Sequence, residues 1–134
     1  MGTIGRHVLA DYAGCTPKLL ADPKALLRLL RRAAKAAHAT VVGETVMSTP
    51  VGITAVLVIS ESHLCIHTNI EEGEALADFY TCGECQPERA YEVLVKGLHA
   101  SRFQKLIFVR GLLDQSPSIR VVGQEGKDAG ISNS

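Results

Sequence analysis

The stretch GITAVLVISESHLCIHTN, residues 52–69, contains two apolar runs joined by a short polar segment. The runs AVLVI and LCI are rich in β-branched residues and are typical of two adjacent β-strands. The polar segment from Ser60 to His63 has no Gly, Pro, Asn or Asp, on which tight hairpin turns usually depend. The sequence therefore predicts a hairpin that turns on a Glu-Ser pair, and this turn is the first candidate for a functional feature.

Other segments on both sides of this hairpin predict the rest of the fold. Two helices are expected, at residues 22–39 and 86–100, because leucines and alanines recur there at helical spacing. Asp22 can cap the first helix, and Pro23 suits its first position. Strands are expected at residues 6–14, 40–49, 52–60, 63–69, 75–82 and 103–111.

The order of these segments is strand, helix, four strands, helix, strand. Short connections favour antiparallel pairing, and two helices can cover only one face of such a sheet. We therefore predict an α+β fold, a two-layer α/β sandwich whose antiparallel sheet has both helices on one face. A second copy of the chain is expected to cover the other face, which makes the protein a homodimer.

Composition limits the classes of function. The chain has 134 residues, which favours a single domain, and its 14 Lys and Arg balance 14 Asp and Glu. A neutral balance gives no general attraction for nucleic acid or anionic membrane. The absence of a signal-like or membrane-spanning apolar run predicts a cytoplasmic protein, in which four cysteines are expected to remain thiols. Residues 123–134, which are small and polar, predict a flexible tail.

Two kinds of site are considered for the histidines and cysteines and disfavoured. His63, His67, Cys82 and Cys85 could in principle bind zinc. However, four residues along a strand span about 13 Å, too far for two ligands of one metal, and no metal is predicted. The C-x-x-C of Cys82 and Cys85 precedes a helix, as redox pairs do, but the strands before it do not form the βαβ unit of thioredoxin-like proteins.

A third reading explains the Glu-Ser turn. The hydroxyl of Ser62 can attack the preceding carbonyl group in a strained turn, which gives an ester, and β-elimination then breaks the chain. The dehydroalanine left behind hydrolyses to a pyruvoyl group, a ketone that forms a Schiff base with a substrate amine and acts as an electron sink in decarboxylation. From the residues alone, a polar hairpin with a core histidine remains the simpler alternative.

Three motifs nevertheless make the chain similar to a known family. GRH at Gly5–His7, VISESHLCIHT at residues 58–68 and YTCG at Tyr80–Gly83 resemble the prokaryotic S-adenosylmethionine decarboxylases, small pyruvoyl enzymes of spermidine synthesis. The resemblance runs to about Gly111. It implies a two-layer sandwich that dimerises with its active sites near the interface, and a reaction that belongs to polyamine biosynthesis.

The resemblance also implies roles for individual residues. Self-cleavage is expected between Glu61 and Ser62, to give chains 1–61 and 62–134, with the pyruvoyl cofactor formed from Ser62. His67 matches the histidine that assists processing, and Cys82 matches the cysteine that donates a proton to the decarboxylated carbon. Glu71 matches the acidic residue that binds the ribose hydroxyls. No role is assigned to His7, His63, His99 or the other cysteines.

Departures from the family leave the substrate open. Thr54 stands where a serine usually assists processing, and its hydroxyl is expected to act more slowly. Ser48 and Asn69 stand where aromatic residues usually stack on adenine, which weakens adenosine binding. S-adenosylmethionine is the leading substrate, and arginine or ornithine is the alternative, because Asn69 and the acidic run 71–74 suit a cation. A further alternative is a catalytically dead paralogue that regulates an active decarboxylase.

Overall fold

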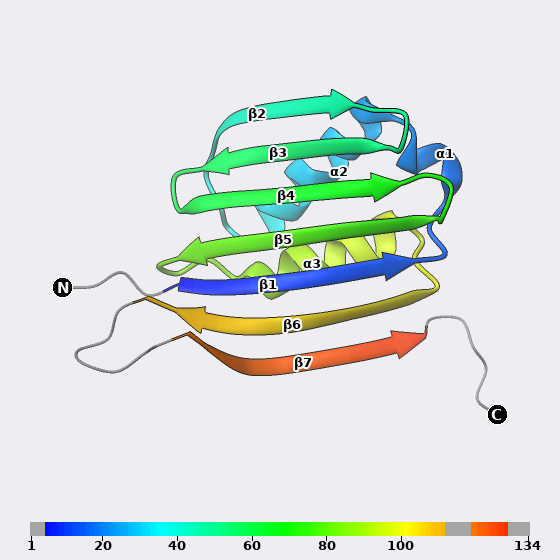
Figure 1. The fold of residues 1–134 in the computed structure, drawn as a ribbon. Coiled ribbons are helices and arrows are strands. Elements are labelled where there is room, and N and C mark those ends of the chain that lie inside the picture. Colours follow the sequence, from blue (N-terminus) through cyan, green and yellow to red (C-terminus); the bar gives the residue numbers. More distant parts are fainter. Residues whose placement is uncertain (1–4, 112–118, 129–134) are drawn as a thin grey trace.

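The computed structural model describes residues 5–111 and 119–128 as one seven-stranded antiparallel sheet with helices on one side (Figure 1). The strand order is β2-β3-β4-β5-β1-β6-β7. The elements in chain order are β1 (Gly5–Ala13), α1 (Pro17–Leu20), α2 (Pro23–Ala36), β2 (Val41–Ser48), β3 (Ile53–Ile59), β4 (Ser62–Asn69), β5 (Glu74–Cys82), α3 (Pro87–Gly97), β6 (Arg102–Arg110) and β7 (Arg120–Asp128).

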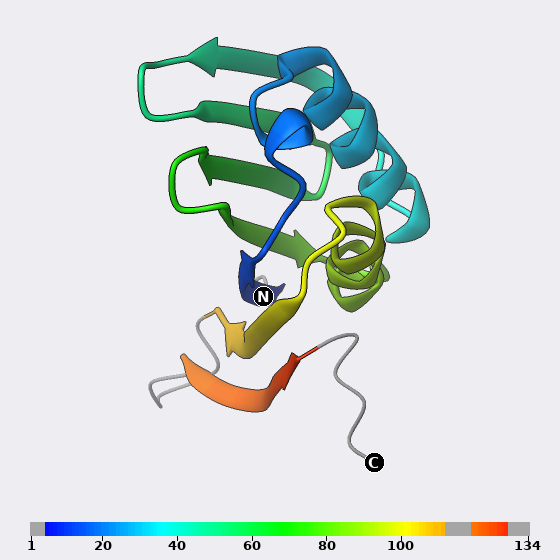
Figure 2. The same ribbon diagram turned by 90° about the vertical axis from the view of Figure 1, so that its right-hand side faces the viewer.

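Helices α2 and α3 pack side by side on the same face of the sheet (Figure 2). Asp22 caps α2 by accepting a hydrogen bond from the backbone N–H of Ala25 at 3.1 Å, and Pro23 begins the helix. The buried leucines and alanines of α2 point to the sheet, as their spacing predicts. The predicted two-layer α+β fold with an antiparallel sheet is therefore confirmed.

The hydrophobic core lies between the sheet and these helices. Alternate residues of each central strand enter it, such as Leu64 and Ile66 of β4, and Phe79 of β5 is fully buried beside them. Thr68 is a buried polar residue in this layer, and its hydroxyl donates to the carbonyl oxygen of Leu20 at 2.9 Å. A buried polar group needs a hydrogen-bond partner, and this bond supplies one for the Thr68 hydroxyl.

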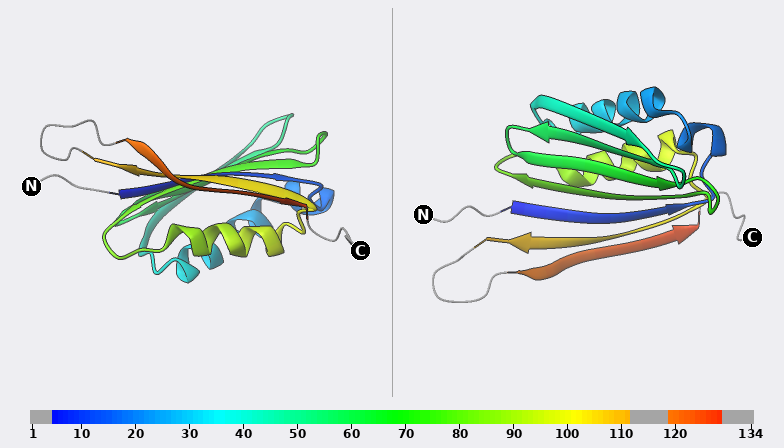
Figure 3. Two further views of the ribbon diagram at one scale, coloured as in Figure 1. Left: turned by 90° about the horizontal axis from the view of Figure 1, so that it is seen from below. Right: turned by 45° about the horizontal axis from the view of Figure 1, so that its top comes forward.

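The opposite face of the sheet is not covered by any described part of the chain (Figure 3). Leu9, Val58, Leu76 and Leu106 lie on this face and are 37–49% exposed. Because side chains alternate across a strand, every second residue of β1, β4 and β5 also reaches this open face. The polar groups described below are among them.

The structure corrects one expectation, about the end of the chain, and adds a short helix that was not predicted. Residues 123–128, predicted to begin a flexible tail, belong to β7, which pairs with β6 at the edge of the sheet. An edge strand can form through backbone hydrogen bonds to one neighbour even when its side chains are polar. The hydropathy of this segment therefore did not indicate a strand. Residues 129–134 of the predicted tail lie outside the described residues. The short helix α1 was also not predicted.

Candidate active site

The turn between β3 and β4 is strained at the predicted cleavage site. Ile59 pairs with Ser62, so the hairpin turns on Ser60 and Glu61 alone. Turns this short normally place a positive φ angle on one or both of their two central residues. Here the positive φ falls instead on Ser62, at 151°, a value that residues other than glycine rarely adopt. Such a conformation costs about 1–3 kcal/mol, and only surrounding contacts can hold it.

Two residues, Thr40 and Cys82, hold Glu61 at this turn. The backbone N–H and the hydroxyl of Thr40 donate to the Glu61 carboxylate at 3.0 and 3.2 Å, and the backbone contact is the main reason that the pKa of Glu61 is lowered. The thiol of Cys82 donates to the backbone carbonyl oxygen of Glu61 at 3.2 Å. The acyl group of the Glu61–Ser62 bond is therefore fixed in place and polarised on its oxygen.

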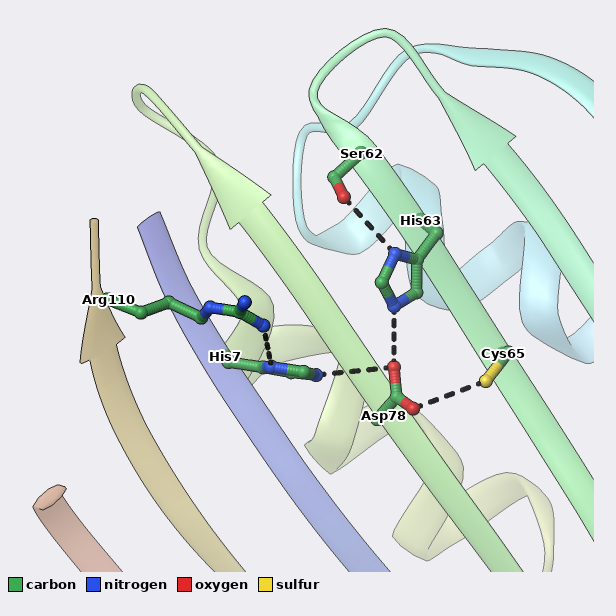
Figure 4. Close-up of polar contacts among 6 residues, drawn as sticks. All are labelled: His7, Ser62, His63, Cys65, Asp78 and Arg110. Atoms are coloured by element: carbon green, nitrogen blue, oxygen red, sulfur yellow. Dashed lines mark hydrogen bonds and ion pairs between the residues drawn. The ribbon is translucent and has the colours of Figure 1, made fainter. Parts of the chain in front are cut away.

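The hydroxyl of Ser62 begins a chain of polar contacts along the open face (Figure 4). Its Oγ lies 3.1 Å from Nδ1 of His63, and Nε2 of His63 lies 2.7 Å from Oδ1 of Asp78. His63 is on β4 and Asp78 on the neighbouring strand β5. The side chains of His63 and Asp78 are 37% and 32% exposed, so the contacts are partly shielded from water.

Asp78 is surrounded by further donors from other strands. Nε2 of His7, on β1, lies 3.3 Å from Oδ1, and the thiol of Cys65 donates to Oδ2 at 3.4 Å. Arg110, on β6, lies 3.2 Å from Nδ1 of His7. The contacts with His7, and next those with His63, lower the pKa of Asp78 to about 2. The carboxylate is therefore charged at neutral pH.

The four residues considered for zinc, His63, His67, Cys82 and Cys85, do not form one group of ligands in the structure. The described residues contain one group of three candidate metal ligands within 4.8 Å of one another, and it consists of His7, His63 and Asp78. Cys85 lies apart from it, with Sγ 3.5 Å from the carbonyl oxygen of His38. Burial raises the pKa of Cys85, whereas a reactive thiol in a redox pair has a lowered pKa.

The remaining predicted residues lie at the opposite end of the strands. Oγ1 of Thr54 is 2.7 Å from Nδ1 of His67, so the two predicted processing residues do meet. His67 is five residues after Ser62 on one strand, which is about 16 Å. Within one chain, His67 and Ser62 are therefore not in contact.

The predicted substrate-binding residues are at the same end as His67. Ser48 ends β2 and is exposed, and Asn69 ends β4. Glu71 is exposed in the turn that follows, where Oδ1 of Asn69 accepts a hydrogen bond from the backbone N–H of Glu72 at 3.1 Å. The amide of Asn69 therefore has a structural partner in this turn.

Comparison with known proteins identifies the family. Residues 6–111 match the family model for S-adenosylmethionine decarboxylase. The chain belongs to the S-adenosylmethionine decarboxylase family. It is 38% identical over 117 residues to the S-adenosylmethionine decarboxylase proenzyme of Thermotoga petrophila, an alignment that covers 86% of this chain and 90% of the relative. The proenzyme of Pyrococcus furiosus is 33% identical over 117 residues, with coverage of 86% and 84%.

A solved structure of the family has the same fold. The crystal structure of the adenosylmethionine decarboxylase from Aquifex aeolicus superposes with a TM-score of 0.74 at 30% identity, and covers 85% of this chain and 96% of that one. In the part of this chain that the structure describes, no helix is long and apolar enough to cross a membrane. The family model, the relatives and the solved structure together confirm the sequence resemblance at the level of family and fold.

Four residues of this family member were not predicted as functional from the sequence: His7, His63, Asp78 and Arg110. They come from β1, β4, β5 and β6, and the separation of His7 and Arg110 is 103 residues. The sequence did contain one signal for His63. It follows Ser62 directly, and it precedes Leu64, which lies on the buried face of the same strand. This places His63 on the open face, although only the sheet order shows which groups it meets there.

Proposed function

We propose that this protein is a self-cleaving, pyruvoyl-dependent decarboxylase of polyamine biosynthesis, with S-adenosylmethionine as its substrate. The observation that carries the proposal is the turn at Glu61–Ser62. There a serine with φ of 151° follows a carbonyl group that accepts a hydrogen bond from Cys82. The relatives named as S-adenosylmethionine decarboxylase proenzymes support both the self-cleavage and the substrate.

Cleavage begins at Ser62. Its Oγ attacks the carbonyl carbon of Glu61 and loses its proton, and the peptide C–N bond breaks as the nitrogen gains a proton, which gives an ester. A base then removes the Cα proton of Ser62, the Cβ–Oγ bond breaks, and Glu61 leaves as a carboxylate. The resulting dehydroalanine takes up water and releases ammonia. During the attack the thiol of Cys82 can stabilise charge on the carbonyl oxygen.

The residues around Ser62 fit a pyruvoyl group at this position. When formed, the pyruvoyl carbonyl supplies an electron sink for decarboxylation. Ser62 and Cys82 are each half-buried, and the backbone of Ser62 pairs with Thr81, the residue before Cys82. The thiol is therefore held beside the new amino terminus, where it can donate a proton to the product carbon.

A homodimer would complete this site. Thr54 and His67 contact each other about 16 Å from Ser62 along one strand, so they cannot serve the Ser62 of their own chain. A two-fold axis that packs the open faces together and reverses the strand direction brings this end of one chain over Ser62 of the other. The exposed Leu9 and Leu76 on the open face support the same contact.

The polar positions Ser48 and Asn69 favour a second candidate substrate. Adenine has no aromatic partner at either position, and Glu71 is exposed nearby. Arginine or ornithine therefore remains a candidate. Measuring release of carbon dioxide from S-adenosylmethionine, arginine and ornithine by the same preparation decides between them, because turnover of an amino acid without turnover of S-adenosylmethionine contradicts the leading proposal.

Intact mass under denaturing conditions tests the reaction class. We expect the chains 1–61 and 62–134, the second with a pyruvoyl terminus, and a single uncleaved chain for Ser62→Ala. Cleavage of Ser62→Ala at the same bond would contradict the proposal. A wild-type chain that stays intact but binds an active relative would instead support a regulatory paralogue.

A further inference from the structure

The hydrogen-bond pattern around His63 fixes which ring nitrogen carries the proton. The charged carboxylate of Asp78 can only accept, and it lies 2.7 Å from Nε2 of His63. In the neutral imidazole, Nε2 therefore carries the hydrogen, and Nδ1 presents its lone pair to the Ser62 hydroxyl at 3.1 Å. This is the arrangement of a serine activated by an adjacent general base, with the base oriented by a third group.

The neighbouring residues favour this arrangement over a metal site. Arg110 can only donate, so its contact with Nδ1 of His7 leaves the hydrogen of the neutral His7 ring on Nε2, which faces Asp78. Nε2 of His63 thus donates to Asp78, whereas Nε2 of His7 lies 3.3 Å from the same oxygen atom without forming a hydrogen bond. On both rings the nitrogen that is nearest to the carboxylate carries the hydrogen and has no lone pair for a metal. The guanidinium group beside His7 further disfavours a cation here.

We propose that His63 is the general base that activates Ser62 in the first step of self-cleavage, and that Asp78 is the residue that positions it. This inference rests on the proposed self-cleavage. Nδ1 of His63 takes the proton from Ser62 Oγ as Oγ bonds to the carbonyl carbon of Glu61. The protonated ring then gives this proton to the departing nitrogen of Ser62, so the ester forms with no net change in protons.

The two histidines of β4 thus act in different steps of self-cleavage. His63 is adjacent to Ser62 and contacts its hydroxyl. His67, paired with Thr54 at the other end of the strand, is available only from a second chain and acts in the elimination step. Ester formation thus needs one chain alone, whereas completion of the cleavage needs two.

Hydroxylamine separates the two steps, because it cleaves an ester within the chain without forming a pyruvoyl group. The test follows the full-length chain, made by cell-free translation, by intact mass with and without hydroxylamine. We expect His63→Ala to lengthen the half-life of the intact precursor by about a hundredfold or more, with no hydroxylamine-sensitive ester. His67→Ala should accumulate that ester. His99→Asn removes an exposed imidazole elsewhere and should match the wild type.

Added imidazole and a conservative variant of Asp78 extend the test beyond a structural role. Because His63 is 37% exposed, imidazole should shorten the half-life of the His63→Ala precursor. Asp78→Asn should lower the rate of ester formation, and Asp78→Glu, which keeps a carboxylate to orient the ring, should restore part of it. The other titratable groups that face His63 are His7 from β1, Tyr80 from β5 and, through His7, Arg110 from β6, whereas β3 presents only Val58.

Three results would overturn the assignment. One is ester formation in His63→Ala at the wild-type rate. Another is ester formation in Asp78→Asn at the wild-type rate. The third is loss of cleavage on treatment with a chelator and its recovery with zinc, which would make the cluster a metal site. Failure of the proposed function itself is distinguishable, because the wild-type chain would then stay intact and Ser62→Ala would have no effect.

Discussion

The thiol of Cys82 lies 3.2 Å from the backbone carbonyl oxygen of Glu61, and thus donates to the acyl group at the predicted cleavage site. A donor at this oxygen stabilises the charge that develops as Ser62 attacks. The thiol is a weak donor, so Cys82→Ala should slow cleavage by about tenfold, less than the loss of a strong oxyanion donor. Cys82→Ser, which keeps a hydroxyl donor, should cleave faster than Cys82→Ala.

Time courses of intact mass measure this effect. Cys15→Ala is a matched control, because that thiol is buried in the core and contacts neither the Glu61 carbonyl group nor Asp78. Equal cleavage rates for Cys82→Ala and the wild type would show that the contact has no role in processing.

The lowered pKa of Asp78 makes the free energy of unfolding depend on pH. Its pKa is lowered to about 2 in the folded chain, below the usual value of an unfolded chain, about 3.9. The carboxylate therefore stabilises the fold above about pH 4, and this contribution is lost as pH falls toward 2. After allowance for its partial exposure, the contribution is about 1–2 kcal/mol.

Urea unfolding of Ser62→Ala, with and without Asp78→Asn, measures this contribution in a chain that stays uncleaved. The two proteins should differ at pH 6 and converge near pH 2. Asp11→Asn, which removes a carboxylate from the same face but outside the cluster, serves as the control. A difference between the first two proteins that is constant with pH would contradict the expected ionisation.

Replacing Gly52 by alanine is expected to cause a steric clash at the end of the strands that carries Thr54 and His67. A Cβ at Gly52 would lie 1.9 Å from the backbone oxygen of Thr68, a contact that backbone atoms cannot easily relieve. Gly52→Ala should therefore destabilise the fold by about 1–3 kcal/mol, as overpacking does. At Gly43 a Cβ meets Val58 at an ordinary 3.7 Å, so Gly43→Ala is the control for thermal melting. Equal melting temperatures would contradict the predicted clash.

The structural features that could be predicted were those that depend on residues close together in the sequence. The hairpin at residues 52–69 and the capped helix after Asp22 depend on local patterns, and both are in the structure. The strand β7 depends on backbone pairing with β6 and has no side-chain pattern, so the sequence did not indicate it.

The arrangement of the site depended on information that the sequence does not contain. The motifs gave Ser62 and Cys82, and the structure places the Cys82 thiol against the carbonyl group that precedes Ser62. The cluster at Asp78 required the order β4-β5-β1-β6, in which sequence neighbours are not all spatial neighbours. The distance between Ser62 and His67 follows from strand geometry, and the proposed homodimer accounts for it.

Restoring the aromatic positions predicts a gain in affinity for S-adenosylmethionine. Ser48→Phe together with Asn69→Trp would supply two faces on which adenine can stack, each worth about 1–3 kcal/mol. We expect KM for S-adenosylmethionine to fall by at least about tenfold, with a smaller change in kcat. Asn69→Ala alone is the control for loss of the hydrogen bond to Glu72. An unchanged KM would mean that these positions do not face the nucleoside.

Complementation between two inactive variants tests whether the site is shared. Ser62→Ala lacks the nucleophile and His67→Ala lacks the predicted elimination base, so neither should form a pyruvoyl group alone. When the two are coexpressed, a mixed dimer contains one site with Ser62 from one chain and His67 from the other. With random pairing, about half of the His67→Ala chains should then be cleaved, and decarboxylase activity should appear.

The control for this experiment is a double variant that carries both substitutions in one chain. Coexpressed with Ser62→Ala, it leaves no Ser62 in any chain, so it should give no cleavage. Absence of cleavage in the complementing pair would contradict the shared site if mass spectrometry shows that mixed dimers form. Cleavage of His67→Ala alone would instead show that His67 is not required. The 16 Å between Ser62 and His67 on one strand would then need no second chain to bridge it.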